Sequence, residues 1–206
     1  EGDIDFESPA CLDMDLLGEH LNALARGEEI HLPRYNFVTR VQSGPIGRPM
    51  RLGKDEVAVC EGIHALNDDI AAYCPDAFRL YISARSIVVD SDGREVFKGT
   101  WMRLLRRLVR DSNFRGTPAA ATLDMWANVR RGEKRFISPF KERANLMFDS
   151  SFPCEVSILK NYAAPLLAAV PEGAERYAEI RSILPALERF ETIDPALLAP
   201  ESMLRE

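Results

Sequence analysis

One stretch of the sequence defines an element of the fold more clearly than the rest: Arg103-Leu-Leu-Arg-Arg-Leu-Val-Arg110-Asp111-Ser-Asn-Phe-Arg115-Gly116. At helical spacing, the arginines at positions 103, 106, 107 and 110 fall along one side of a helix. Apolar residues cover the other side, namely Trp101, Leu104, Leu105, Leu108 and Val109. The pattern therefore predicts a helix with one buried face and one positively charged face.

This charged face stands out because the formal net charge of the 206 residues is -6. A local reversal of charge indicates an anionic partner. Arginine presents a planar fork of donors that stays charged, so several converging arginines suit a polyphosphate whose charge spreads during phosphoryl transfer. The alternative is a solvated arginine face that binds no ligand.

Hydrophobic periodicity and turn residues predict the other elements. Helices are expected at residues 9–26, 64–73 and 118–131, with two more between 155 and 190 that are split by residues 171–173. Strands are expected at residues 29–32, 36–42, 57–60, 78–83 and 145–148, with a turn at 44–49 and a loop at 86–99. The apolar runs 57–60 and 78–83, with a helix between them, have the βαβ rhythm of a parallel sheet. The hairpin around Pro33 is expected to form a lid over the substrate.

Composition narrows the class of protein. A chain of 206 residues that is 46% hydrophobic and 28% charged can bury a core, so we expect a single domain over residues 1–206. No apolar run approaches the roughly 20 residues that span a bilayer, so we expect a cytoplasmic protein with no membrane contact. The sequence pI near 5.3 argues against nucleic acid as the main partner.

Cysteines and acidic loops give no metal signature. The four cysteines are scattered, which favours buried free thiols over disulfides or zinc ligands: Cys11, Cys60, Cys74 and Cys154. The run Asp90-Ser-Asp92-Gly93 lacks the downstream glutamate of a calcium loop, so calcium is not expected there.

Several motifs follow one another in a specific order. They are Asp5-Phe6-Glu7-Ser8-Pro9-Ala10, Leu32-Pro-Arg-Tyr35-Asn-Phe37, Val57-Ala-Val-Cys-Glu61-Gly62-Ile-His64-Ala-Leu66, the arginine stretch, Trp126-Ala-Asn-Val-Arg130-Arg131-Gly132-Glu133, Ser138-Pro-Phe-Lys141 and Met147-Phe-Asp149-Ser-Ser151. In this order the chain resembles the uridine kinase and phosphoribulokinase group of P-loop kinases over nearly its whole length. The resemblance implies an α/β fold, with a P-loop kinase-like, mostly parallel sheet flanked by helices and a small β-hairpin lid.

The phosphate loop of that group is missing from the sequence. Nothing matches Gly-x-x-x-x-Gly-Lys-Ser/Thr, and the nearest run, residues 44–55, has the wrong spacing. The resemblance therefore implies a sheet that is incomplete at its N-terminal side. The loop, its lysine and the acidic general base are expected upstream, so the chain would be the distal part of a kinase domain.

The resemblance also implies roles for individual residues. Glu61, expected at the carboxyl end of a parallel strand, would lie near the Mg²⁺ that accompanies ATP, although it could instead cap the next helix. By the same resemblance, Glu7 would bind the ribose hydroxyls, and Tyr35 and Arg107 would line the nucleoside pocket. Arg110 and Arg115 would contact the phosphates. Core packing is the alternative for Tyr35, and Arg103 and Arg106 are expected to be solvated or structural.

Some positions depart from the uridine kinase pattern. Thr117 and Met125 occupy the positions where those enzymes have the arginine and the glutamine that bind the pyrimidine. Arg40 occupies the position of a histidine, and Asn36 that of an aspartate. A pocket without donors matched to a base edge discriminates that base weakly. The acceptor is therefore less defined than the class of reaction.

Three functions follow as hypotheses. The first is an ATP- and Mg²⁺-dependent kinase that phosphorylates a hydroxyl of a nucleoside, uridine- or cytidine-like, or of a related polyol. The second is a non-catalytic fragment or module that binds a ligand or a partner chain. The third is a sugar-phosphate kinase resembling phosphoribulokinase. The resemblance also allows a homo-oligomer.

Overall fold

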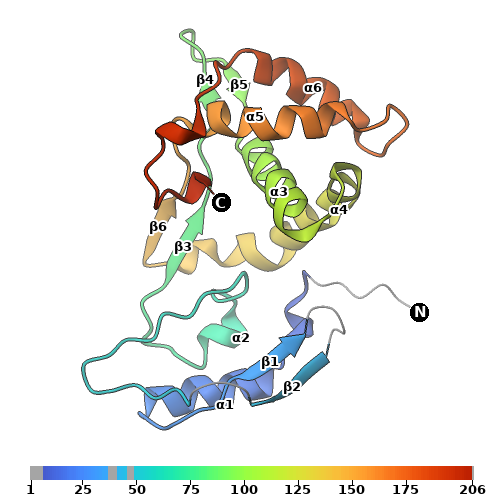
Figure 1. Ribbon diagram of the computed structural model, residues 1–206. Helices are drawn as coiled ribbons and strands as arrows, with labels where there is room; N and C mark the ends of the chain where they lie inside the picture. Colours follow the sequence, from blue (N-terminus) through green and yellow to red (C-terminus); the bar gives the residue numbers. More distant parts are fainter. Residues whose placement is uncertain (1–6, 37–40, 46–48, 206) are drawn as a thin grey trace. The chain divides into compact units, whose positions relative to one another are not determined.

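The computed structural model describes residues 7–36, 41–45 and 49–205, which form two compact units (Figure 1). Unit 1 comprises Glu1–Leu80 and Gly132–Leu146, and unit 2 comprises Tyr81–Arg131 and Met147–Glu206. The expectation of one domain over residues 1–206 stays a prediction.

The first helical region of unit 1 consists of two pieces. A 3-10 turn, Pro9–Cys11, is capped by the Ser8 side chain, which accepts a hydrogen bond from the N–H two residues on at 3.3 Å. The helix α1, Met14–Ala25, then begins at Asp13, whose carboxylate caps it at 3.1 Å. Gly27 follows the helix with a φ of 70°. The predicted helix at 9–26 is confirmed, with a break where Asp13 starts a new helix.

Unit 1 contains a hairpin whose strands lie at other residues than the sequence predicted, and the expected strand at 36–42 includes residues 37–40, which lie outside the described residues. Strands β1, Pro33–Asn36, and β2, Val41–Pro45, pair antiparallel. The first expected strand, residues 29–32, lies too early in the sequence, because there only Ile30 forms an isolated bridge, with Met50. Proline lacks an N–H group and is found at the first residue of a strand, which fits Pro33 at the start of β1.

Residues 57–60 are not the strand that the sequence predicted. They have no regular secondary structure, and Val57 and Val59 are 85% and 91% exposed. A strand needs a hydrogen-bonded neighbour, and among the described residues no strand pairs with this segment. The helix expected at 64–73 is likewise reduced to α2, Asp68–Ala71, with turns on either side.

The parallel part of the fold is the pair β3, Leu80–Ser83, and β6, Leu146–Asp149. The strands run in the same direction, because the hydrogen-bond partners advance together along both: Asn145 N–H to the Arg79 carbonyl at 2.8 Å and Ser150 N–H to the Ser83 carbonyl at 3.2 Å. The predicted strands at 78–83 and 145–148 are therefore confirmed, as is the α/β class. The expectation that 57–60 and 78–83 are strands of one parallel sheet is wrong, because 57–60 is not a strand.

Helices of 12 to 17 residues form much of unit 2 (Figure 1). They are α3, Gly99–Arg115, α4, Ala119–Gly132, α5, Glu155–Ala168, and α6, Tyr177–Glu188. Helix α3 ends at Gly116, which has a left-handed conformation with a φ of 60°. The helices predicted for the arginine stretch, for 118–131 and for the tail are all confirmed.

Shorter helical segments complete the described chain. Helix α4 continues directly into a π-helical turn, and the other segments are 3-10 helices: Glu133–Ile137 (π), Ser138–Arg143, Pro195–Leu197 and Met203–Arg205.

The stretch expected to be a loop at 86–99 contains a second hairpin. Strands β4, Val88–Val89, and β5, Glu95–Phe97, pair antiparallel. The Asp90 carboxylate accepts hydrogen bonds from the backbone N–H groups of Asp92 and Arg94, both at 3.0 Å, and thereby closes the turn. The sequence did not predict these two strands, because they are too short to show an alternation of apolar and polar residues.

The hydrophobic core lies mainly in unit 2, where α3 to α6 pack with β5. Phe97 is 1% exposed, and its ring meets Trp101 and Phe190 edge to face at 5.4 Å and 5.6 Å. In the described part of unit 1, by contrast, only Leu24 and Ile30 are buried apolar residues.

The described helices include none that is both long enough and apolar enough to cross a membrane. All four cysteines are free, as predicted, but Cys11 and Cys60 are exposed rather than buried. Both lie in segments with little apolar cover, which explains the error in the expected burial.

Candidate active site

Asp111 is a buried carboxylate near the end of α3, and three arginines gather around it. The residue is 1% exposed. Arg107 Nε lies 3.3 Å from Oδ2, whereas Arg110 Nη2 and Arg115 Nη1 lie 3.3 Å and 3.2 Å from Oδ1. Helical geometry places Arg107 and Arg115 beside Asp111, because residues four positions apart share a face, whereas Arg110 is the direct neighbour of Asp111 in the sequence. We call these four residues the Asp111 cluster.

The aspartate is also fixed from its own backbone and from α4. The hydroxyl of Thr122, a fully buried residue, donates to Oδ2 at 3.4 Å. The Asp111 carbonyl accepts the N–H of Gly116, the C-terminal cap of α3, and the N–H of Thr117 at 3.0 Å. Its position is therefore determined by main-chain and side-chain contacts together.

Two arginines of the cluster are held without being enclosed. The side chains of Arg110 and Arg115 are 49% and 55% exposed, and that of Arg107 is 20% exposed. The distances to Asp111 exceed the roughly 2.7–2.9 Å of a strong charge-assisted hydrogen bond. Each guanidinium has five N–H donors, far more than three arginines can place on two carboxylate oxygens. Three positive charges and one negative charge leave the cluster with a net charge of about +2.

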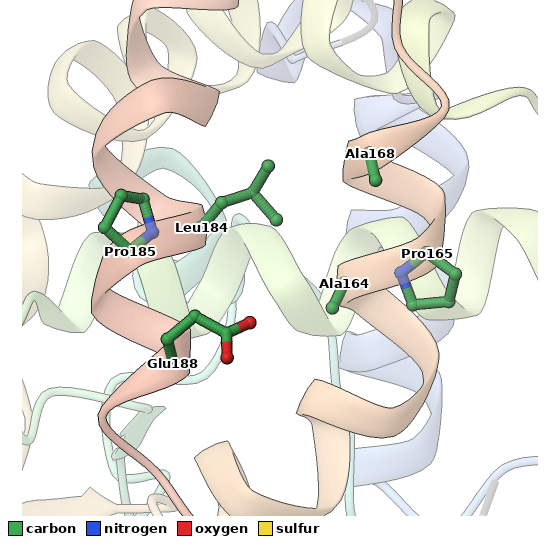
Figure 2. A pocket seen from close by; sticks show the side chains of 6 residues that line it. All are labelled: Ala164, Pro165, Ala168, Leu184, Pro185 and Glu188. Atoms are coloured by element: carbon green, nitrogen blue, oxygen red, sulfur yellow. The ribbon is translucent and has the colours of Figure 1, made fainter.

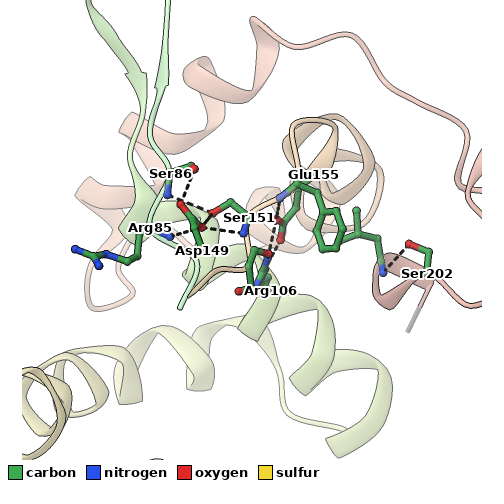
Figure 3. Close-up of polar contacts among 10 residues, drawn as sticks. Arg85, Ser86, Arg106, Asp149, Ser151, Glu155 and Ser202 are labelled. Atoms are coloured by element: carbon green, nitrogen blue, oxygen red, sulfur yellow. Dashed lines mark hydrogen bonds and ion pairs between the residues drawn. The ribbon is translucent and has the colours of Figure 1, made fainter. Parts of the chain in front are cut away.

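A second α3 arginine site is closed instead. Arg106 forms a two-pronged ion pair with Glu155 of α5, which is fully buried (Figure 3). Arg106 Nη2 also donates to the Ser150 carbonyl at 2.6 Å, and the Phe152 N–H donates to Glu155 at 3.2 Å. Arg106 is thus structural, one of the two outcomes expected for it.

Asp149, in the Met147-to-Ser151 motif, ties the ends of β3 and β6 together (Figure 3). Its Oδ1 accepts the Ser151 hydroxyl at 2.6 Å and the Arg85 N–H at 3.1 Å, and its Oδ2 accepts the Ser86 hydroxyl at 2.8 Å. The Ser151 hydroxyl and these other donors hold the pKa of Asp149 well below its usual range. This motif therefore has a structural role in unit 2.

Glu7, expected to bind ribose hydroxyls, lies in unit 1 against Gly132. A methyl group on Gly132 would place its carbon 2.4 Å from Cβ of Glu7, so only glycine leaves room for this side chain. The buried ring of His64 lies nearby and meets Phe136 edge to face at 6.4 Å. Neither ring nitrogen reaches a hydrogen-bond partner among the described residues. Burial lowers the pKa of His64, and the backbone groups of Phe136 and Glu7, which lie close to the ring without hydrogen-bond geometry, oppose this shift only in part.

Tyr35 and Glu61 also belong to unit 1. Tyr35 lies on β1 opposite Gln42 and is 45% exposed, which does not fit the alternative of core packing. Glu61 is exposed and follows residues 57–60, so it does not emerge from a strand as expected. In the described part of the chain, no three His, Cys, Asp or Glu residues form a metal-binding group. Mg²⁺ nevertheless takes one or two carboxylates plus phosphate oxygens and water, which the single carboxylate of Glu61 fits.

The positions that depart from the uridine kinase pattern are partly visible. Thr117 lies between α3 and α4 beside the Asp111 cluster, and Met125 is a 41% exposed residue of α4. Asn36 ends β1. Arg40 lies outside the described residues.

Two hollows lie away from these residues. One, of about 810 Å³ in unit 1, lies between α1 and the β1–β2 hairpin, and its described lining includes neither Glu7 nor Tyr35 nor Glu61. The other, of about 710 Å³, lies between α5 and α6 and is lined by Ala164, Pro165, Ala168, Leu184, Pro185 and Glu188 (Figure 2).

The structure therefore brings the three predicted arginines together, while Glu7, Tyr35 and Glu61 belong to unit 1. Sequence reasoning missed Asp111 and Glu155. The signal for Asp111 was available, because it stands four residues from both Arg107 and Arg115. No local sequence signal marked Glu155, because its partner Arg106 is 49 positions away in the sequence.

Comparison with known proteins identifies the family of this chain. The profile of the phosphoribulokinase / uridine kinase family matches residues 1–156, so the chain belongs to that family. Among curated relatives, the uridine kinase of Bacillus pumilus is 28% identical over 154 residues, 74% of this chain and 65% of the relative. Over the same length, the uridine kinases of Oceanobacillus iheyensis and Staphylococcus haemolyticus are 29% and 27% identical, covering 65% and 66% of their lengths. The chain thus spans about two thirds of the relatives that it matches.

Proposed function

We propose that this chain is the distal part of an ATP-dependent kinase that phosphorylates a hydroxyl of a nucleoside or a related polyol. The Asp111 cluster is the observation that carries the proposal. Phosphoryl transfer depends on positioning and on positive charge that meets the oxygens of the transferred group. A partly exposed cluster with a net charge of about +2 suits that task. Membership in a family of kinases supports it.

Each arginine then has a distinct task. Arg110 and Arg115 have the more exposed guanidinium groups, so they would meet the phosphates of ATP. Arg107 is more enclosed and would contact the acceptor. In the reaction, the acceptor oxygen bonds to the terminal phosphorus while the bond to the bridging oxygen of ADP breaks. The hydroxyl proton passes to an acidic residue that we place upstream of Glu1.

Unit 1 would supply contacts to the acceptor and to the metal. Glu7 can accept two hydroxyl hydrogen bonds at once, and the Tyr35 ring and hydroxyl suit a nucleoside. Glu61 is the carboxylate of this chain that would hold Mg²⁺, which neutralises phosphate charge when bound.

We further propose that the phosphate loop lies upstream of these 206 residues. The sequence contains no such loop. Parallel strands are normally covered on both faces, yet apolar residues of β3 and β6 are 38% to 57% exposed: Leu80, Ile82, Leu146, Met147 and Phe148. A preceding unit with a phosphate loop and its strand would cover them.

A transfer assay with ATP and Mg²⁺ tests both parts of the proposal. The 206-residue chain should show no turnover, because backbone amides and a lysine are needed to cradle the β- and γ-phosphates. The protein that includes the upstream region should phosphorylate a nucleoside. Turnover by the chain alone would disprove the missing loop, and no turnover by the longer protein with any acceptor would favour a non-catalytic binding module.

A sugar-phosphate kinase is the second candidate, and Thr117 and Met125 favour it. Neither side chain offers the fork of donors and acceptors that reads a pyrimidine edge. An acceptor panel separates the two candidates. Uridine and cytidine should give the highest kcat/KM if the first proposal holds, whereas a sugar phosphate should do so if the second holds.

A further inference from the structure

The Asp111 carboxylate has an environment that folding alone does not require. A buried carboxylate is costly to desolvate, and replacing a buried ion pair by apolar residues is often neutral or stabilising. Arg110 and Arg115 could instead extend into water, because their side chains are already about half exposed. Their convergence on Asp111 orders two long side chains at a loss of conformational entropy. This arrangement indicates a role in placing the guanidinium groups.

The contacts around Asp111 can orient the three arginine side chains. Oδ1 receives Arg110 and Arg115, which lie on either side of it in the sequence, while Oδ2 receives Arg107. Thr122 from α4 contacts Oδ2, and Gly116 and Thr117 hold the main chain. The carboxylate is therefore a fixed point, and it also offsets the repulsion among three like charges.

We propose that Asp111 is a positioning residue, which holds Arg110 and Arg115 in the orientation that meets the phosphates of ATP and Arg107 in the orientation that meets the acceptor. This inference rests on the proposed kinase function. Asp111 itself would touch neither ATP nor the acceptor.

Glu155 provides a matched control, because it is also a buried carboxylate that pairs with an α3 arginine. Asp111→Asn and Glu155→Gln each keep the shape of the side chain and remove its charge. In the protein that includes the phosphate loop, Asp111→Asn should lower kcat at least tenfold at a temperature where both variants are folded. Glu155→Gln should lower the melting temperature and leave kcat within twofold of the wild-type value.

A binding experiment separates orientation from charge. Removing a negative charge beside three arginines should strengthen the binding of an anion if Asp111 acts only through charge. If it positions the arginines, tripolyphosphate should bind the 206-residue Asp111→Asn chain at least threefold more weakly than the wild-type chain in calorimetry at low salt. Tighter or unchanged binding, or an unchanged kcat, would overturn the inference.

Two further points keep this test decisive. If Asp111→Asn does not fold, Thr122→Val loosens the same carboxylate with a side chain of equal shape, and a kcat equal to the wild-type value would then refute positioning. If the wild-type protein phosphorylates no acceptor, the kinase proposal fails. The tripolyphosphate comparison still decides whether Asp111 orients the arginines.

Discussion

Helix α3 presents two arginine sites that differ in the number of arginines for each carboxylate and in how exposed those arginines are. At one, a single arginine, Arg106, meets a fully buried glutamate, and a backbone carbonyl takes another of its donors at 2.6 Å. At the other, three arginines share one aspartate at 3.2 to 3.3 Å, and two of them are about half exposed. The first site is closed by its own partners, whereas the guanidinium groups of Arg110 and Arg115 at the second site stay about half open to solvent. Arginines on the same helix therefore differ in how far the surrounding chain encloses them.

The largest expected effect concerns the closed site. Glu155→Ala leaves Arg106 buried in part without its carboxylate, and breaking a buried pair in this way costs about 3–5 kcal/mol. Chemical denaturation of the 206-residue chain measures the loss. The double replacement Arg106→Met with Glu155→Leu should recover most of it, since it leaves no unpaired charge. A loss below about 1 kcal/mol in Glu155→Ala would show that the pair behaves like a surface salt bridge.

The next effect concerns the open site. Arg110→Ala with Arg115→Ala should lower kcat about 100-fold or more in the protein with its phosphate loop, because arginines that meet transition-state charge contribute on that scale. Stability should change by about 0.5 kcal/mol per residue, as for other exposed residues.

Arg103→Ala, on the same helix but outside the cluster, is the control and should keep the wild-type kcat. Wild-type turnover in the double variant would show that the open site is only a charged surface.

An exposed carboxylate outside both sites extends the comparison. Glu61→Gln removes the charge and keeps the shape, so the Mg²⁺ concentration for half-maximal activity should rise about tenfold, as ligand-shell changes typically do. A Mg²⁺ titration of initial rates at saturating ATP measures this shift. An unchanged requirement would mean that Glu61 only caps the following segment.

The smallest effect concerns the buried ring of His64. Burial lowers the pKa of His64 from its ordinary value of 6.5, so below that pH the unfolded chain binds a proton that the folded chain resists. The free energy of unfolding should therefore be highest above about pH 6.5 and fall as the pH drops below it. His64→Phe keeps an aromatic ring against Phe136 and cannot titrate, so its stability should depend less on pH over the same interval. Equal slopes in the two proteins would contradict the assignment.

The sequence predicted most helices well, because each of these carries its own apolar period and end signals, whereas the helix expected at 64–73 is reduced to Asp68–Ala71. The arginine helix, with Gly116 after it, is the clearest case. Residues 57–60 were misjudged because an apolar run becomes a strand only beside another strand, which the run itself does not encode. The hairpin at 88–97 was missed because strands of two and three residues show no period.

For the candidate site, the sequence predicted the three arginines but not Asp111, the carboxylate on which they converge. Charge and helical spacing were enough to place Arg107, Arg110 and Arg115 on one element. The paired carboxylate of Glu155 depends on how α5 packs against α3, which no local pattern contains. The roles of Glu7, Tyr35 and Glu61 stay predictions, because they depend on ligands rather than on contacts within the chain.

Gly132 has a consequence for attempts to stabilise this protein. Its backbone is helical, with a φ of -59° and a ψ of -47°, so alanine there would favour the helix by up to about 1 kcal/mol. A thermostability screen that ranks sequences by helix propensity would select Gly132→Ala. The added methyl group would meet Glu7 at 2.4 Å and displace it. A single carbon atom thus sets a more stable helix against the present position of Glu7, and a variant chosen only for heat resistance would give up the second to gain the first.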